Sequence, residues 1–192
     1  HEFDSGTAEL RRKQVGGCEK HTVREPCALE PFKGAKFRFL AANVKLKDGK
    51  GTLFPATALK SFGKGRRKVT LGFIGMTLEG TSSLVSASGV ADVTFADEAQ
   101  TANALVTGLK AQGADAIVLA IHEGGEQSAG SDPQGCEGLT GAIRDIAQRL
   151  DPRIATQFKL ADCLEKQGRS ASARTNFGDV AGSTKAAGQK ER

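Results

Sequence analysis

The sequence contains no tryptophan and no tyrosine, and it has one methionine and five prolines among its 192 residues. Phenylalanine is therefore the only aromatic ring with strong stacking capacity for a nucleobase. No apolar run approaches the roughly 20 residues that cross a bilayer, which excludes a spanning helix from the sequence. No secretory signal is visible, because no basic stretch is followed by an apolar core and small residues. The chain starts at His1, so we expect that its true start was removed by processing or truncation.

Charge is distributed unevenly along the chain, whose formal net charge is +5. Residues 1–68 carry 16 basic and 7 acidic side chains, residues 69–150 carry 3 and 10, and residues 151–192 carry 8 and 5. A uniformly basic nucleic-acid binder has a different pattern. We interpret the basic residues between Arg11 and Lys68 as a solvated face, and we predict no nucleic-acid partner.

Three short apolar segments predict β-strands. Residues 37–44 alternate between apolar and polar and then become apolar, which is typical of a strand that enters a core. Residues 69–76 predict a buried strand whose glycines let another backbone approach closely. Residues 116–121 are apolar throughout, which predicts a central strand covered on both faces.

A helix is predicted over about residues 97–112, and Gly113 is well placed to end it. The apolar residues of this segment recur at three- and four-residue spacing: Ala99, Ala102, Leu105, Val106 and Leu109. A strand, a helix and a uniformly apolar strand then follow one another between residues 69 and 121. This order predicts a βαβ unit and an α/β fold class.

Two further helices are predicted outside the βαβ unit. One starts just after Asp4, a candidate N-cap, and runs through Leu10. The other covers about residues 139–150 and is broken by Asp151-Pro152. Its apolar face comprises Ile143, Ile146, Ala147 and Leu150.

The composition changes after Ile154, where large apolar side chains become sparse. We expect a partial domain over residues 1–154 and a divergent basic tail over residues 155–192. In that tail, residues 156–167 are expected to form a helix and residues 168–192 to be disordered.

His122 is the histidine whose position most favours a functional role. It lies one residue beyond the apolar strand 116–121 and is followed by two glycines. Ligands of open α/β sheets bind at the loops that follow the carboxyl ends of strands. Position alone leaves two alternatives for His122, a site residue or a surface histidine. His21 lies in a charged stretch, and we assign it no role.

His1 and Asp4 are three residues apart, close enough for the carboxylate to accept a hydrogen bond from the imidazole. Such a bond fixes the tautomer and stabilises the imidazolium, as a general acid requires. The alternative is that Asp4 caps the helix that follows it, and one oxygen can serve each task.

These residues lie in motifs that resemble a known family. His1-Glu2-Phe3-Asp4-Ser5-Gly6 resembles the Gly-Asn-His-Glu-Phe-Asp-x-Gly signature of the 5'-nucleotidase branch of the calcineurin-like metallophosphoesterases. Ile121-His122-Glu123-Gly124-Gly125 is similar to the next motif of that branch. Further blocks match family segments in the same order, at residues 39–44, 53–55, 71–77, 113–118 and 136–153. The resemblance covers about residues 1–154.

The resemblance implies a layered α/β/β/α sandwich, here incomplete at both ends, and the hydrolysis of nucleotide phosphomonoesters. Family sites hold two divalent metal ions, such as Zn²⁺ or Mn²⁺, which activate a water and clamp the phosphate ester. By the same resemblance, His1 stabilises the transition state or protonates the leaving group, Asp4 orients His1, and His122 ligates one metal ion. The expected partner is a nucleotide or other phosphate ester, and the expected location is the periplasm or the cell surface. The oligomeric state is not predicted.

The sequence also departs from the family. The Asp-x-His and Gly-Asp motifs of the family would precede His1, and its Gly-His-(Thr/Ser)-His motif would follow Ile154, where the sequence has no further histidine. Of the side chains that hold the metal pair, only His122 is present. We therefore predict an impaired fragment, truncated or frameshifted, that binds metal weakly and hydrolyses little. The alternatives are a non-catalytic nucleotide- or anion-binding fragment and a product without a function of its own.

Four cysteines allow three complete disulfide pairings, and the sequence does not choose among them. Cys18 and Cys27 are close together in a stretch with few core residues, and in an oxidising compartment they can staple that loop. Free thiols are the alternative. No Cys-x-x-Cys motif is present, which argues against a zinc ribbon.

Overall fold

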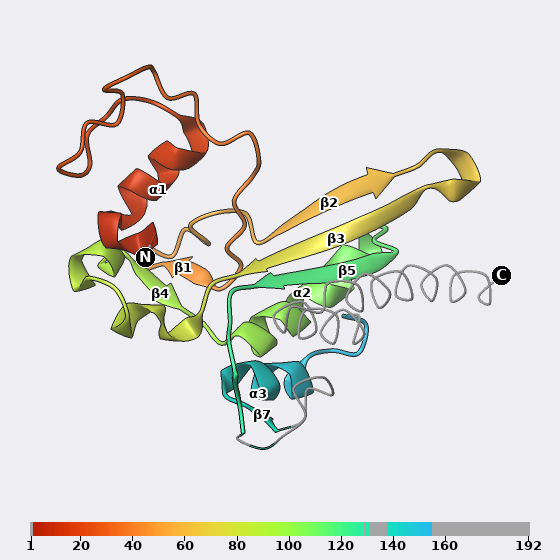
Figure 1. The fold of residues 1–192 in the computed structure, drawn as a ribbon. Coiled ribbons are helices and arrows are strands. Elements are labelled where there is room, and N and C mark those ends of the chain that lie inside the picture. The colour runs from red at the N-terminus through yellow and green to blue at the C-terminus, as the bar shows by residue number, and fades with distance from the viewer. Residues whose placement is uncertain (1, 129, 131–137, 155–192) are drawn as a thin grey trace. The chain divides into compact units, whose positions relative to one another are not determined.

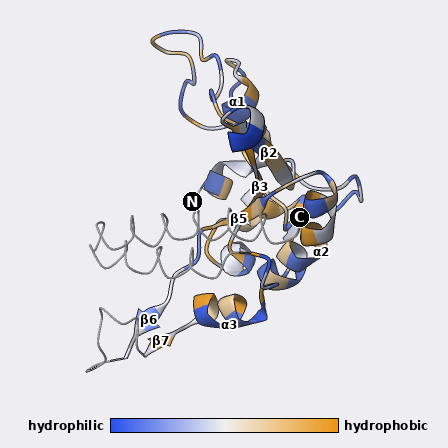
Figure 2. Cartoon of the chain, turned by 90° about the vertical axis from the view of Figure 1, so that its right-hand side faces the viewer, coloured by the Kyte–Doolittle hydropathy of each residue, from blue (hydrophilic) through white to orange (hydrophobic). Residues whose placement is uncertain are grey.

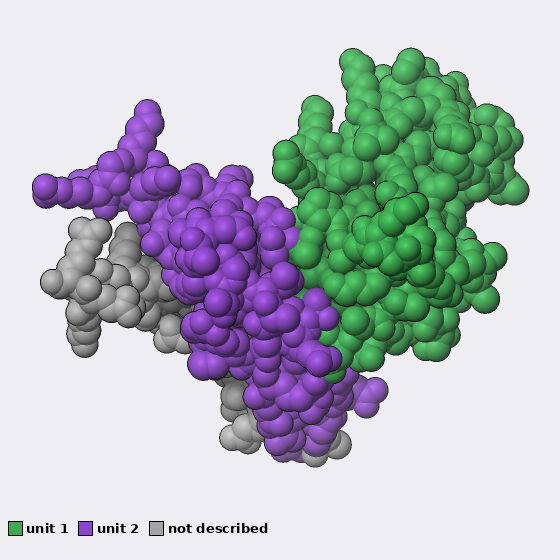
Figure 3. Space-filling view, turned by 180° about the vertical axis from the view of Figure 1, so that it is seen from behind, with its two compact units in different colours: residues 1–56, 75–98 green, residues 57–74, 99–192 purple. Residues whose placement is uncertain are grey.

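The structure is a computed structural model that describes residues 2–128, 130 and 138–154 (Figure 1). The chain divides into two compact units, shown in different colours in Figure 3. Unit 1 comprises His1–Ala56 and Gly75–Glu98, and unit 2 comprises Thr57–Ile74 and Ala99–Arg192. The expected tail over residues 155–192, with its expected helix and disordered end, lies outside the described residues.

Unit 1 combines one α-helix, three 3-10 helices and a two-stranded antiparallel sheet. In chain order these are η1 (Glu2–Ser5), α1 (Gly6–Val15), β1 (Val44–Leu46), η3 (Glu79–Ser83), η4 (Ala87–Val90) and β4 (Val93–Phe95). In the sheet, β1 pairs with β4, so that Val44 lies opposite Phe95 and Leu46 opposite Val93. The buried core of this unit consists of Phe3, Leu10, Ala41, Val44, Leu53, Val90 and Val93.

The first helix differs from its prediction at both ends. Ser5 rather than Asp4 occupies the N-cap position, and α1 continues past Leu10 to Val15. The Asp4 carboxylate instead accepts a hydrogen bond from a distant segment, the backbone N–H of Ser86. The helix continues past Leu10 because the two arginines, the lysine and the glutamine that follow are themselves good helix formers.

The predicted strand over residues 37–44 was wrong except for its last residue, where β1 begins. The burial that it implied is present, because Ala41 and Ala42 are buried. Their backbone N–H groups, however, donate to two different segments, at the carbonyls of Pro55 and Gly75. Alternating apolar residues therefore predicted burial correctly, while scattered hydrogen-bond partners prevent a regular ladder.

Unit 2 is built around a sheet with the strand order β2-β3-β5. The remaining elements in chain order are β2 (Thr57–Phe62), η2 (Gly65–Arg67), β3 (Val69–Met76), α2 (Glu98–Ala111), β5 (Ala116–Ile121), β6 (Glu126–Gln127), β7 (Leu139–Thr140) and α3 (Ala142–Arg149). The strands β2 and β3 are antiparallel, with Phe62 opposite Val69. Two hydrogen bonds between Asp115 and Thr70 join the start of β5 to the start of β3, so these two strands run parallel.

The predicted βαβ unit and the mixed α/β class are confirmed. Both strands have the predicted bounds, and α2 lies within the predicted helix. The predicted apolar face of α2 is buried, with exposed fractions of 0 to 1% at Ala99, Ala102, Val106 and Leu109. A Cβ added at Gly72 of β3 would meet the side chain of Leu109, so this helix covers one face of the sheet.

The predicted helix over residues 139–150 is confirmed in part. Residues 139–140 form β7, so α3 begins at Ala142. The four residues of the predicted face, Ile143, Ile146, Ala147 and Leu150, are the ones between residues 142 and 150 that are not exposed. Orange residues on α3 in Figure 2 mark this apolar stripe. Asn103 of α2 fastens the end of α3, because its side chain donates to Arg149 O and accepts from Asp151 N.

The prediction of β5 as a central strand was wrong for the part of the chain that the structure describes. In the described residues, β3 is the central strand of the three-stranded sheet and β5 lies next to it at the end of the strand order. On the side of β5 that faces away from β3, Ile117 makes an isolated bridge with Ile154. Ala116 and Ile117 are buried, but Ala120 is exposed. An apolar run indicates which side chains favour burial, but it does not specify the elements that flank them.

Candidate functional site

Asp4 belongs to η1, which is anchored to the core of unit 1 by its neighbour Phe3. The Phe3 side chain is buried, and its ring packs edge-on against Phe95 of β4 with 5.2 Å between the ring centroids. Asp4 itself is exposed. In the His-Glu-Phe-Asp motif, the phenylalanine thus holds the backbone while the aspartate faces solvent. His1 lies outside the described residues, so its predicted hydrogen bond to Asp4 stays a prediction.

A distant segment, residues 86–92, holds this motif in place. The backbone N–H of Ser86 donates to Asp4 Oδ1 at 2.9 Å, and the Ser86 hydroxyl donates to Asp4 O at 3.3 Å. Gly89 lies against the carbonyl of Phe3, where a Cβ would collide with the oxygen. Ser86 and Gly89 could not be recognised from the sequence, because a short serine- and glycine-rich stretch predicts only a turn.

Asn43 also links separate segments of unit 1, and its exposed fraction is 0%. Its side-chain amide donates to the carbonyls of Thr77 and Ala96, at 2.5 and 3.0 Å, and its Oδ1 accepts from the N–H of Thr77 at 2.9 Å. Thr77 directly follows β3, and Ala96 directly follows β4. One side chain therefore joins the residues that directly follow two strands of different sheets.

His122 lies in unit 2, in the loop directly after β5, and is exposed. The two glycines behind it have different surroundings. No atom lies within 4 Å of a Cβ added at Gly124, whereas a Cβ at Gly125 would be 2.6 Å from Thr140 O and 2.7 Å from the Ile143 side chain. Gly125 is therefore needed for the close approach of β7 and α3, and Gly124 leaves space beside His122.

Asp4 and His122 thus belong to different units, each with its own supports. Asp4 is placed by an aromatic anchor and a distant turn, and His122 by the end of a strand of the central sheet. Their catalytic and metal-binding roles stay predictions.

Within residues 2–128, 130 and 138–154, no three histidine, cysteine, aspartate or glutamate side chains form a group that could hold a metal ion. A dinuclear centre needs several ligands as well as the groups that orient them. The described residues therefore do not fit a complete centre of the kind that the family resemblance implies.

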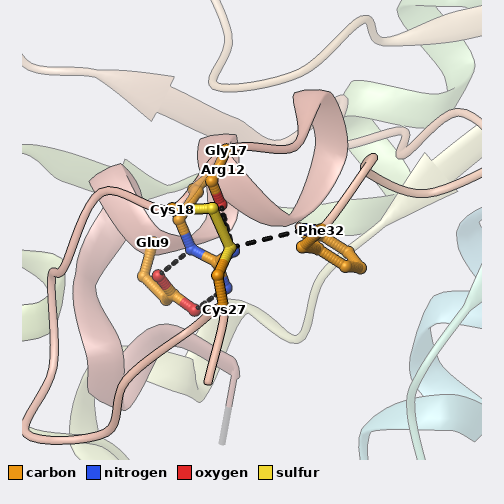
Figure 4. The surroundings of a disulfide bond; sticks show 6 residues. All are labelled: Glu9, Arg12, Gly17, Cys18, Cys27 and Phe32. Carbon is orange, nitrogen blue, oxygen red and sulfur yellow. Dashed lines mark hydrogen bonds and ion pairs between the residues drawn. A yellow bond between two sulfur atoms is a disulfide. The ribbon is translucent and has the colours of Figure 1, made fainter. Parts of the chain in front are cut away.

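Cys18 and Cys27 form a disulfide, with 5.4 Å between their Cα atoms (Figure 4). The loop that they staple follows α1. Its two ends are also joined by backbone hydrogen bonds, from Gly17 N to Phe32 O and from Ala35 N to Lys13 O, both at 2.9 Å. Residues 17–32 therefore form a loop of unit 1 whose two ends are bonded together.

Arg12 connects this loop to α1, as Figure 4 shows. Its guanidinium donates two hydrogen bonds of 2.7 Å to Glu9, donates to Gly17 O at 2.9 Å, and lies 5.2 Å from the centre of the Phe32 ring. The hydrogen bond from Arg12 lowers the pKa of the Glu9 carboxyl. The charged pair thus ties the base of the loop to the helix.

Known proteins resemble this chain over part of their length. No protein-family model matches it. An Acinetobacter calcoaceticus protein described as "uncharacterized protein in pqq-V 5'region" is 54% identical over 65 residues, which are 33% of this chain and 32% of that protein. Endonuclease YhcR of Bacillus subtilis is 29% identical over 158 residues, which are 82% of this chain and 12% of that protein. The chain spans 12 to 32% of the length of the curated relatives that it matches.

Among solved structures, the calcineurin-like phosphoesterase YfkN from Bacillus subtilis superposes with a TM-score of 0.50 at 27% sequence identity. The superposition covers 64% of this chain and 36% of that one. It agrees with the family resemblance that the His-Glu-Phe-Asp and Ile-His-Glu-Gly-Gly motifs indicate. The chain is therefore a relative of the calcineurin-like phosphoesterases and spans part of such a protein.

Proposed function

We propose that this chain is part of a metal-dependent phosphoesterase of the 5'-nucleotidase type, which hydrolyses nucleotide phosphomonoesters. The observation that carries the proposal is the combined likeness to a calcineurin-like phosphoesterase in structure and in ordered sequence blocks. 2',3'-cyclic nucleotides are a second substrate class under the same proposal. Residues 1–154 would form the phosphoesterase part, and residues 155–192 a divergent tail.

Each candidate residue has a proposed role. Asp4 orients His1 and stabilises its imidazolium, which can then donate a proton to the leaving oxygen of the ester. The anchoring of η1 by Phe3 and the bond from Ser86 support this role, because a positioning carboxylate must itself be held. His122 is proposed as one ligand of a metal ion, supported by its exposed place at the carboxyl end of β5.

The first test uses the 192-residue chain itself, with p-nitrophenyl phosphate and added Mn²⁺. Because the described residues do not complete a metal centre, we expect turnover no higher than that of Mn²⁺ in buffer. The His122→Ala variant should then behave like the parent chain. Mn²⁺-dependent turnover that His122→Ala abolishes would contradict the proposal that the chain is an impaired fragment.

The second test uses the product of the complete gene and a panel of nucleoside monophosphates. Asp4→Asn is expected to lower kcat by about 10²- to 10⁴-fold, the usual contribution of a general acid. Glu126→Gln removes an exposed carboxylate of β6 and serves as the matched control, with no change expected. Hydrolysis of a phosphodiester but not of any monoester would overturn the substrate class, and chelator-resistant nucleotide binding without turnover would favour the non-catalytic alternative.

We also propose that the protein works in the periplasm or outside the cell. The disulfide of Cys18 and Cys27 supports this location, since such bonds persist in oxidising compartments. No described helix is long and apolar enough to cross a membrane. Fractionation of cells that express the complete gene, followed by immunoblotting, tests the location; a purely cytoplasmic product would contradict it.

A further inference from the structure

Among the described elements of unit 2, the hairpin formed by β2 and β3 is the most strongly basic. Its residues 57–74 carry five positive side chains and no acidic one. The strands pair over six residues each, from Thr57 opposite Ile74 to Phe62 opposite Val69. The positive side chains are Lys60, Lys64, Arg66, Arg67 and Lys68.

The charges gather at the exposed end of this hairpin. Every residue from 61 to 68 is exposed, and Figure 1 shows the turn, in yellow, projecting beyond β5. One carboxylate lies near the base of the hairpin, where Asp115 Oδ2 accepts a hydrogen bond from the N–H of Thr70 at 2.7 Å, and its single negative charge offsets at most one of the five positive charges. The end of the hairpin therefore presents a positive surface to solvent.

The turn holds its basic residues in a defined conformation. Backbone hydrogen bonds of 3.1 Å run from Arg67 N to Lys64 O and from Lys68 N to Gly65 O, which closes the short helix η2. Four of the five cations thus fall within five consecutive residues of one tight turn. A preorganised turn loses less conformational entropy on binding than a flexible tail does.

An aromatic ring lies beside these charges. The Phe62 side chain is 45% exposed, and Lys60 Nζ lies 5.3 Å from the centre of its ring. Residues two apart on a strand point to the same face, so the ring and this cation share one side of the hairpin. Bases of a single nucleic-acid strand stack on such rings while basic side chains follow the phosphates.

Other partners fit this surface less well. Residues 63–68 are glycine, lysine and arginine only, so a membrane would meet just two large exposed apolar side chains of β2, Leu59 and Phe62, and not the continuous apolar face of a membrane-binding helix. The same six residues offer no apolar surface for the buried core of a protein interface, which disfavours a protein partner.

We propose that the β2–β3 hairpin binds a single strand of nucleic acid, with the turn cations on consecutive phosphates and Phe62 stacked on a base. Charge counts along the sequence predict no nucleic-acid partner. They do not show that these cations meet at one exposed turn beside an exposed ring. The proposal is independent of the phosphoesterase function.

The experiment measures the fluorescence anisotropy of a labelled oligothymidylate of about 16 nucleotides, with the 192-residue chain and a chelator present. Four phosphate contacts predict an affinity that falls about 50-fold between about 50 and 200 mM salt. Replacing Lys64, Arg66, Arg67 and Lys68 by glutamine should weaken binding at least about tenfold at the lower salt.

A matched control removes the same charge from unit 1, by glutamine at the exposed residues Arg24, Lys33, Lys36 and Arg38. This control should bind within about twofold of the parent chain. Phe62→Ala should weaken binding by about fivefold or more, and Phe62→Tyr should restore it. Circular dichroism of each variant shows that the fold is kept.

Three results would overturn the proposal. One is the absence of oligonucleotide binding at the lower salt concentration, whether or not the chain binds phosphatidylserine vesicles. Another is an equal loss in both glutamine variants, which would mean that net charge alone acts. The third is unchanged binding by Phe62→Ala, which would remove the stacking site.

Discussion

Asn43 illustrates how one polar side chain can order a region that backbone ladders do not reach. It is fully buried and makes three hydrogen bonds to residues that follow two different strands. A buried amide is tolerated because its bonds replace those to water. Removal of the amide leaves its buried backbone partners without a hydrogen bond to protein or to water. The resulting loss of free energy is larger than the net contribution of the original bonds.

We therefore expect Asn43→Ala to lower the free energy of unfolding by about 2–4 kcal/mol, as for two or more unsatisfied buried groups. Urea denaturation of the 192-residue chain, followed by circular dichroism, measures the change. Ser82→Ala, at an exposed position of the same unit, is the control and should shift stability by less than about 0.5 kcal/mol. A loss at Asn43 no larger than that of the control would contradict the role of the amide.

The sequence could identify the apolar core but not this amide. Ala99, Ala102, Val106 and Leu109 were predicted because burial on a helix repeats with a known period. A lone buried asparagine has no period, and its partners lie 34 and 53 residues away. The hydrogen bonds of Asn43 depend on the tertiary fold, which a local sequence pattern does not reveal.

Among the helices and strands, prediction succeeded for a helix, whose backbone hydrogen bonds lie within one segment, and for strands that contain a continuous run of apolar residues. The strands β3 and β5 and the helix α2 meet these conditions, and their bounds were predicted to within one residue. The short strands β1 and β4 do not, because three residues carry too little pattern. The turn η4, which holds the motif around Asp4, was missed for the same reason.

Two glycine substitutions should change stability in opposite directions. Gly89→Ala places a methyl group against the carbonyl of Phe3 and should cost about 1–3 kcal/mol, the usual range for overpacking. Gly108→Ala lies within α2 with no atom within 4 Å and should stabilise by about 0.5–1 kcal/mol, since alanine is the better helix former. Thermal unfolding of both variants measures the two signs. An equal or greater stability of Gly89→Ala would show that η4 is not packed against η1.

At the scale of the whole molecule, the family could be predicted from ordered motifs, whereas the geometry of the site could not. The His-Glu-Phe-Asp motif did not show that Phe3 would be its anchor or Ser86 its support, since these contacts join residues more than 80 positions apart. Position after β5 placed His122 correctly at the end of a strand. The pairing of Cys18 with Cys27 was one of several that the cysteine count allowed.

The disulfide should stabilise the whole chain through its unfolded state. Closing a loop of this length is worth about 2–3 kcal/mol in chain entropy, so Cys27→Ser should lower Tm by about 5–10 °C. Differential scanning calorimetry with and without reductant measures the effect. Reductant should lower the Tm of the parent chain by more than that of the variant, because the variant lacks this disulfide. An unchanged Tm of the parent chain in reductant would contradict this role.

The same loop determines how the protein would respond to a protease. Lys20 and Arg24 are exposed and lie between the two bonded cysteines, so trypsin can cut the chain there without separating the pieces. A molecule cut once between Cys18 and Cys27 would migrate as one band on a gel without reductant and as two bands with it. Limited cleavage in this stretch would therefore leave unit 1 covalently continuous, since the disulfide bridges the broken peptide bond.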